Sequence, residues 1–200
     1  MGTIKDRTGE VGMNRQGVKM WILKYNTSND VLVQFESGYV TKSKYVNFME
    51  GNIKDPYIIS IYGHGYMGWG KYKTVHNGKH TKMYRTWSGM LDRCYGNRER
   101  LPWYDDCTVC IEWHNFQNFA KWYEENYYEI EGERIELDKD ILYDGNKIYS
   151  PFTCVFAPQD VNLMFRKNKN LSNKRLNFVC EKYKGLIPDV LYNRLLELQN

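Results

Sequence analysis

The segment from Glu136 to Phe165, ELDKDILYDGNKIYSPFTCVFAPQDVNLMF, constrains the fold of this chain more than any other. It starts with a short apolar-acidic run, Leu137–Leu142, and passes through an Asp-Gly-Asn turn into a second apolar run, Phe152–Ala157. Pro158 follows, a residue typical of the first turn of a helix. The order of these signals predicts a ββα unit, in which two antiparallel strands pack against one short helix.

Length and composition indicate an ordered globular protein. The 200 residues are enough for one domain or two small ones with a sizeable core. Hydrophobic residues make up 42% and aromatic residues 16%, which excludes long disordered regions. No run approaches the roughly 18 apolar residues of a membrane helix, and residues 1–30 lack the apolar core of a secretion signal. We therefore expect a soluble, intracellular protein without a membrane partner.

Signals for strands and helices divide the chain into three segments of an α+β fold. Residues 1–56 predict a small β domain, either a twisted sheet or a barrel. Residues 57–165 predict a core with a hairpin, two helices and the ββα unit, and residues 166–200 predict a basic linker with a helical tail. The strands expected in the first segment are Val18–Tyr25, Val31–Phe35 and Tyr39–Tyr45. The later elements expected are hairpin arms Lys71–Val75 and Lys82–Tyr84 around Asn77-Gly78, helices Tyr84–Tyr95 and Glu112–Tyr127, and a last helix opened by Pro188.

Five cysteines, an odd number, with no secretion signal predict reduced thiols. Cys107 and Cys110 form a C-x-x-C pair, and His114 lies one helical turn further on. Cys94 could supply a fourth ligand for zinc, but the spacing is irregular for such a site. Buried thiols are the alternative, and we expect no zinc.

Three longer strings carry a resemblance to a known family: YRTWSGMLDRCY, WYDDCTVCIEWHNFQNFAKWYEENY and LDKDILYDGNKIYSPFTCVFAPQDVN. Together they resemble phage-encoded HNH-type (His-Me finger) endonucleases, in many of which an APETALA2-like DNA-binding domain follows the nuclease-like core. The resemblance runs from about Gly9 to Phe165. It implies DNA as a partner and a place in the cytoplasm of a bacterial host.

The end of the chain departs from that pattern. Proteins of this kind usually continue from the motif Asn162–Phe165 into the additional domain, whereas here a basic linker and the tail EKYKGLIPDVLYNRLLEL follow. The tail resembles the segment found after that domain. The resemblance therefore implies a version without the extra domain, and much of the sequence-independent affinity for DNA would be lost with it.

The resemblance also implies a degenerate finger. HNH nucleases use a histidine at the end of the first strand as general base, and a residue of the helix holds a metal ion at the phosphate. The base position aligns with Lys139 and the middle asparagine with Thr153, so only Asn162 remains. All four histidines precede the finger: His64, His76, His80 and His114.

Carboxylates offer the remaining route to catalysis. Asp138 and Asp140 alternate along the predicted strand, so both face one side, with Lys139 on the other. With Asn162 they could chelate Mg²⁺ or Mn²⁺ through oxygen atoms. Lys139 would act as a base only if it lost its proton, which its acidic neighbours oppose. The alternative is an Asp-Lys-Asp edge that pins the finger by salt bridges, and the sequence leaves open whether hydrolysis occurs.

Basic residues interleaved with aromatic ones predict two contacts with nucleic acid. A β-hairpin of this composition can lie along a phosphate backbone. The first patch contains Lys71, Lys73, Lys79, Lys82 and Arg85, and the second contains Arg166, Lys167, Lys169, Lys174 and Arg175. The alternative for each patch is an ordinary solvated surface.

Two functions are compatible with these features. The first is a phage DNA-binding protein of the HNH endonuclease-like class, with weak or absent metal-dependent nuclease activity. The second is an inert accessory protein that binds and inhibits a host defence nuclease of the CRISPR or restriction type. Residues 111–145 carry 3 basic and 10 acidic side chains, a net charge of −7, and such a block could imitate phosphates. The same block also fits a helix with a solvated acidic face.

Overall fold

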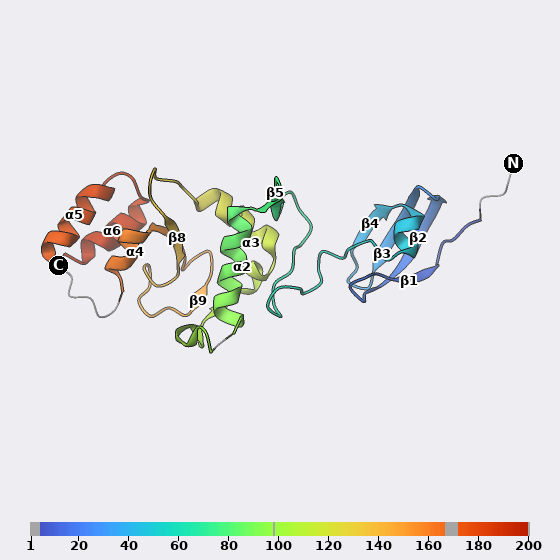
Figure 1. Ribbon diagram of the computed structural model, residues 1–200, viewed down its shortest axis with the longest axis horizontal. Coiled ribbons are helices and arrows are strands. Elements are labelled where there is room, and N and C mark those ends of the chain that lie inside the picture. Colours follow the sequence, from blue (N-terminus) through green and yellow to red (C-terminus); the bar gives the residue numbers. More distant parts are fainter. Residues whose placement is uncertain (1–4, 98, 167–171, 200) are drawn as a thin grey trace. The chain divides into compact units, whose positions relative to one another are not determined.

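A computed structural model describes residues 5–97, 99–166 and 172–199 of this α+β protein (Figure 1). The chain forms two compact units. The first unit contains the described residues up to Ile59 together with Tyr66–Trp69. The second unit contains Ser60–Gly65 and the described residues from Gly70 onward. Among the described helices, none is long and apolar enough to cross a membrane.

The first unit is a four-stranded antiparallel sheet in which each strand pairs with the next along the chain. Its strands are β1 (Val11–Met13), β2 (Lys19–Thr27), β3 (Asp30–Phe35) and β4 (Val40–Ser43). Val31, Val33 and Phe35 of β3 point to one face and are buried, as expected of a strand with one side on a core. A short helix, α1 (Tyr45–Met49), adds Phe48 to that core.

The predicted sheet of the first unit is confirmed, with three differences. β1 is an extra strand, and its three residues are too few to show an alternating pattern. The predicted strand Tyr39–Tyr45 is wrong at its end, because Tyr45 already begins α1. In the described residues β1 and β4 are the two edges of the sheet, so the strands do not close into a barrel.

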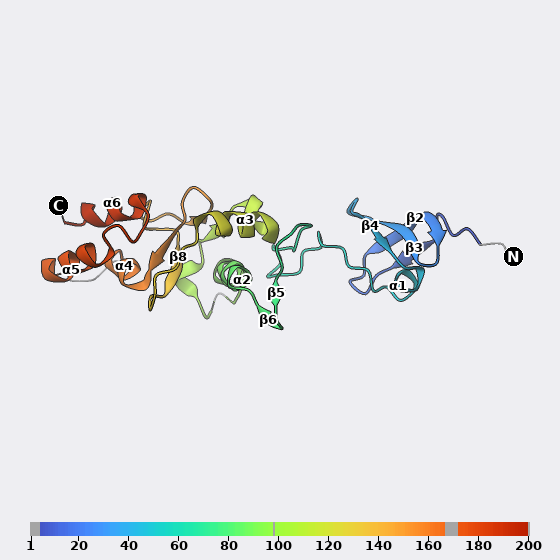
Figure 2. The same ribbon diagram turned by 90° about the horizontal axis from the view of Figure 1, so that it is seen from above.

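The first half of the second unit contains a small hairpin and two main helices. Its elements are β5 (Val75–His76), β6 (Lys79–His80), α2 (Lys82–Tyr95), the 3₁₀ helix η1 (Pro102–Tyr104), β7 (Thr108–Val109), the 3₁₀ helix η2 (Ile111–His114) and α3 (Phe116–Asn126). Figure 2 shows α2 end-on, between the β5–β6 hairpin and β8.

The hairpin turn is confirmed, but both predicted arms are wrong: of Lys71–Val75 only Val75 lies in a strand, β5. Asn77 and Gly78 have φ angles of 48° and 73°, the left-handed backbone that a type I′ turn needs. The predicted arm Lys82–Tyr84 instead lies in α2. The hydroxyl of Thr81 accepts a hydrogen bond from the backbone N–H of Tyr84, and this cap starts the helix before a second strand can extend.

Helices α2 and α3 form an aromatic core. The apolar stripe predicted for α2 is confirmed, since Trp87, Met90, Leu91 and Cys94 are all buried. The second predicted helix begins later than expected, because the side chain of Asn115 accepts a hydrogen bond from the backbone N–H of Gln117 and caps α3 there.

The second half of this unit contains three short strands and three helices. β8 pairs antiparallel with β10, β9 pairs parallel with β7, and α4 follows β10 directly. The helix predicted after Pro158 is confirmed, whereas the strands predicted at Leu137–Leu142 and Phe152–Ala157 are both shorter. The elements are β8 (Ile135–Asp138), β9 (Ile148–Tyr149), β10 (Val155–Pro158), α4 (Gln159–Met164), α5 (Asn173–Tyr183) and α6 (Asp189–Glu197).

Helix α5 was not predicted, and its first turn overlaps the end of the basic linker expected at Arg166–Arg175. Its buried residues are spaced i, i+3, i+4, i+7: Leu176, Val179, Cys180 and Tyr183. They share one core with Ile141, with Val161 of α4 and with Leu191 of α6. Figures 1 and 2 both show α4, α5 and α6 together beside β8. The boundary expected between residues 165 and 166 therefore falls inside a single hydrophobic core.

Candidate functional site

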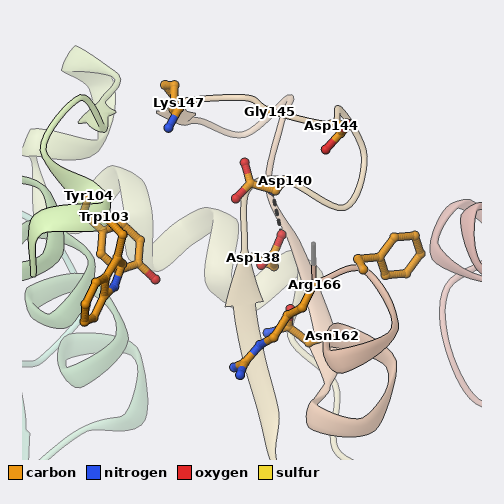
Figure 3. A pocket seen from close by; sticks show the side chains of 10 residues that line it. Trp103, Tyr104, Asp138, Asp140, Asp144, Gly145, Lys147, Asn162 and Arg166 are labelled. Atoms are coloured by element: carbon orange, nitrogen blue, oxygen red, sulfur yellow. Dashed lines mark hydrogen bonds between the residues drawn. The ribbon is translucent and has the colours of Figure 1, made fainter. Parts of the chain in front are cut away.

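The end of β8 opens into a cavity of about 590 Å³, named here the first cavity (Figure 3). In Figure 3, Asp138 and Asp140 lie on one side and Trp103 and Tyr104 of η1 on the other. The walls come from β8, from the turn after it, from η1 and from the end of α4. The lining side chains are Trp103, Tyr104, Asp138, Asp140, Asp144, Lys147, Asn162, Phe165 and Arg166. The three residues expected to bind a metal, Asp138, Asp140 and Asn162, thus line one cavity.

Asp138 is the last residue of β8 and turns the chain by accepting two backbone hydrogen bonds. Its Oδ1 lies 2.6 Å from the backbone nitrogen of Asp140 and 2.9 Å from that of Ile141. Burial raises the pKa of Asp138, although both hydrogen bonds oppose the rise. The predicted alternation of Asp138 and Asp140 along one strand is therefore wrong, because the strand ends at Asp138. The turn nevertheless brings Asp140 to the same cavity.

Lys139 is a buried structural cation. The residue is 4% exposed, and its ammonium donates to Asp140 Oδ1 and Oδ2 at 2.8 and 2.7 Å. A third hydrogen bond, of 2.9 Å, reaches the carbonyl oxygen of Asn146. These contacts occupy all three donors of the ammonium. The geometry matches the salt-bridge alternative for Lys139 and Asp140. An ammonium that donates all three of its hydrogen bonds has no lone pair with which to accept a proton, so Lys139 is not placed to act as a general base.

Asn162 is held by a chain of polar contacts on the other side of the cavity. Its Nδ2 donates to Glu136 Oε2 at 3.0 Å, and Glu136 Oε1 pairs with Arg134 Nε at 3.0 Å. The amide oxygen accepts no hydrogen bond from any described residue. Asn162 therefore lines the cavity with an amide oxygen that has no partner among the described residues.

The donor set is a poor fit for a divalent cation. Burial raises the pKa of Asp138, so its charged form is disfavoured in the folded protein, and Asp140 is already paired with Lys139. In the described part of the chain no three His, Cys, Asp or Glu side chains are grouped to hold a metal ion. The cysteines considered for a zinc site are also a poor fit for a metal ion. Burial raises the pKa of Cys94 to about 12 and that of Cys110 to about 11. Zinc binds thiolates, which such pKa values disfavour.

A second cavity, of about 270 Å³, adjoins the first and shares Tyr104, Asp138, Asp140, Asn162 and Arg166 with it. It adds three arginines to the walls: Arg85 and Arg93 from α2, and Arg134 from the segment before β8. Arg93 and Arg134 were not predicted from the sequence as site residues. Arg85, Gly89 and Arg93 are spaced i, i+4, i+8 and all three line the second cavity, so this spacing is the signal that marks a basic face of α2.

The residues expected to contact nucleic acid separate into three groups. Lys71 pairs with Glu124 at 2.9 Å, Lys82 pairs with Glu129, and Arg175 lies 3.6 Å from Asp160. Four others are exposed and form no ion pair with a described residue: Lys73, Lys79, Arg85 and Lys174. Arg166 is likewise exposed and lines both cavities. Lys167 and Lys169 lie outside the described residues.

No known protein family, no curated protein and no solved structure matches this chain. The two cavities and the charges around them are therefore the observations that bear on function.

Replacing Asp138 by asparagine is expected to keep the turn and to raise the free energy of unfolding near neutral pH. The asparagine Oδ1 can accept the same two backbone hydrogen bonds, while the buried charge is removed. The folded state raises the pKa of Asp138 above its ordinary 3.8, so it binds the proton more tightly than the unfolded chain does. Wild-type stability therefore falls as the pH rises from 3.8 through the folded-state pKa, and the advantage of Asp138→Asn should grow over that window.

Urea unfolding at pH values below and above this window measures the effect. The control is Asp138→Ala, which loses both hydrogen bonds and should be destabilised by roughly 1–3 kcal/mol. If Asp138→Asn loses as much stability as Asp138→Ala, the carboxylate charge itself holds the turn and the explanation is wrong.

Proposed function

We propose that this protein is a phage-encoded DNA-binding protein of the HNH endonuclease-like class, with weak or absent nuclease activity. The observation that supports DNA binding is a pair of exposed cations at the two cavities. Arg166 lines both cavities, Arg85 lines the second, and neither forms an ion pair with any described residue. Cations left unpaired at a concave surface attract phosphates, which supply most of the sequence-independent affinity for DNA.

The arrangement of elements supports the class. β8 pairs antiparallel with β10, and α4 follows β10, which is compatible with a ββα finger that has β9 in the connection between its strands. Helix α4 carries Asn162, the one residue that matches the family motif. A third cavity adjoins the second and shares Arg85 with it; the other charged side chains in its lining are Lys82, Arg134 and Glu133, of which Lys82 and Arg134 pair with Glu129 and Glu136. A nucleic-acid backbone that follows these cavities would pass over the end of β8.

The chemistry of the cavity supports weak or absent hydrolysis. None of the described residues that line either cavity is a histidine. His64 instead stacks on Tyr95 with ring centroids 3.7 Å apart, and His114 Nε2 lies 3.4 Å from the Tyr95 hydroxyl. Lys139 is fully bonded, and the carboxylates are a poor fit for a metal ion. These residues therefore support no catalytic step that uses Mg²⁺ or Mn²⁺.

The second candidate function is inhibition of a host defence nuclease by protein binding. Two large apolar side chains favour it, since Ile111 is 76% and Phe152 is 83% exposed. The acidic block argues against imitation of phosphates, because several of its carboxylates are neutralised within the chain. Glu124, Glu129 and Glu133 pair with Lys71, Lys82 and Lys182, respectively. We rank DNA binding first for this reason.

Binding of a short labelled duplex, measured by fluorescence anisotropy over a range of salt concentrations, tests the proposal. For the wild type, the logarithm of the association constant should fall linearly with the logarithm of the salt concentration. The double variant Arg85→Ala with Arg166→Ala should flatten this slope by about 0.9 for each lost phosphate contact. The charge-matched control is Lys24→Ala with Lys42→Ala, two exposed lysines of the first unit. An equal loss in the control, or no salt-dependent binding by the wild type, would overturn the proposal.

A plasmid-nicking assay with Mg²⁺ and with Mn²⁺ tests the catalytic half. We expect supercoiled plasmid to stay largely intact in both metals. Efficient nicking that is abolished in Asn162→Ala would show that the finger is an active nuclease and would contradict this part of the proposal.

A further inference from the structure

Arg93 lies between two tyrosine rings at the wall of the second cavity. Its guanidinium carbon is 5.3 Å from the ring centroid of Tyr149 and 5.9 Å from that of Tyr104. Tyr149 is buried in β9, so its ring is fixed. The rings attract the cation and keep water away from its faces, but they accept no conventional hydrogen bond from its edge. The hydrogen-bonding edge of the guanidinium therefore needs another partner.

The protein supplies none of the expected partners for this edge. The Nε–H of Arg93 is buried and has no hydrogen-bond acceptor among the described residues. No described carboxylate forms an ion pair with Arg93 either. Buried N–H groups are nearly always bonded, so an orphaned one in a cavity wall points to a ligand that is absent here. A guanidinium whose donors lack protein partners selects an anion with paired oxygens.

The acidic residues of the second cavity have other partners. Glu136 pairs with Arg134 at 3.0 Å, and Asp140 pairs with Lys139 at 2.7 Å. Asp138 accepts two backbone hydrogen bonds at the turn after β8. Three cations, Arg85, Arg93 and Arg166, are then left to balance at most one negative charge. The cavity therefore carries an excess of positive charge that its own residues do not neutralise.

We infer that Arg93 is the centre of a phosphate-binding subsite in the second cavity, with Arg85 and Arg166 at its rim. The guanidinium fork donates paired hydrogen bonds to two phosphate oxygens, and the tyrosine rings hold the fork in place. This inference rests on the proposed function in one respect: the phosphate is taken to be a diester of a bound DNA strand. A free or terminal phosphate group has the same chemistry, and the experiment separates the two sources.

The first arm measures the salt dependence of duplex binding for the full chain and for Arg93→Gln. Loss of one phosphate contact should flatten the slope by about 1 and weaken binding to all sequences alike. Arg93→Lys keeps the charge but not the fork, so it should keep most of the slope and still bind more weakly than the wild type. The charge-matched control is Arg100→Gln, whose arginine is exposed and pairs with Asp92. Circular dichroism and urea unfolding check that each variant is folded, and Arg93→Lys carries the test if Arg93→Gln is not.

The second arm uses inorganic phosphate and does not depend on DNA binding. Phosphate should raise the thermal midpoint of the wild type above that in sodium chloride of equal ionic strength, and Arg93→Gln should lose this increment. If the wild type binds DNA and Arg93→Gln binds with the same slope and affinity, the subsite is refuted while the proposed function stands. If the wild type binds no DNA, the proposed function fails. A phosphate increment that requires Arg93 would then assign the subsite to a smaller phosphate ligand, and an increment that is missing or equal in both proteins would refute it.

Discussion

Replacing Trp87 by alanine should lower the free energy of unfolding of the second unit by about 3–5 kcal/mol. Trp87 is completely buried on α2, and its ring lies 5.4 Å from that of Phe116 on α3. Its Nε1 donates to the carbonyl oxygen of Trp113 at 2.7 Å. Alanine would leave a cavity between the two helices and a buried carbonyl group without its donor, and both effects destabilise.

Urea unfolding followed by far-ultraviolet circular dichroism measures the loss. Trp103→Ala is the matched control, because Trp103 belongs to the same unit and is 68% exposed. Its substitution should change stability by less than about 0.5 kcal/mol. A cost below about 1 kcal/mol for Trp87→Ala would mean that α2 and α3 do not share the core that the structure shows.

Replacing Leu191 by alanine should cost about 2–5 kcal/mol, nearly as much as a substitution in the central core. Leu191 is completely buried on α6 and shares a hydrophobic core with Val161 of α4 and Ile141. The same helix contacts the turn after β8, because Arg194 Nε donates to the carbonyl oxygen of Ile141 at 2.9 Å. A loosened α6 should therefore also disturb the turn that holds Asp140 at the first cavity.

The neighbouring residue provides the control for this second prediction. Val190 lies on the same helix but is 53% exposed, so Val190→Ala should change stability by less than about 0.5 kcal/mol. The readouts are urea unfolding and duplex binding for both variants. If Leu191→Ala is as mild as Val190→Ala, the last two helices are an independent tail and their assignment to the core of the second unit is wrong.

Short-range patterns predicted part of this fold correctly. The Asn77-Gly78 pair predicts its hairpin turn because both residues tolerate a positive φ, a property that needs no distant contact. The apolar stripe of α2 and the alternation in β3 are equally local, since periodicity within one element decides which side chains face a core. Element ends were less predictable: Thr81 stops the hairpin arm and Asn115 delays α3 through single side-chain caps.

The candidate site was predicted less well than the elements that carry it. The sequence brings Asp138, Asp140 and Asn162 to attention, and the structure puts all three on one cavity. It does not reveal that Asp138 ends the strand or that Lys139 is buried against Asp140 and Asn146. Helix α5 was not predicted, because lysines and an arginine make its sequence look like a basic linker. Its apolar residues nevertheless follow an i, i+3, i+4, i+7 pattern.

The sequence by itself determined the local elements of this protein: the antiparallel strands of the first unit, the type I′ turn, and the amphipathic faces of α2 and α3. Only the tertiary structure decided which charged groups have partners. Lys139 is neutralised by its neighbour, whereas Arg93 lies against Tyr149, far along the chain, with its Nε–H left unbonded within the described residues. The physical reason is that backbone geometry depends on a few adjacent residues, whereas the pairing of a charge depends on whatever the folded chain brings within hydrogen-bonding distance.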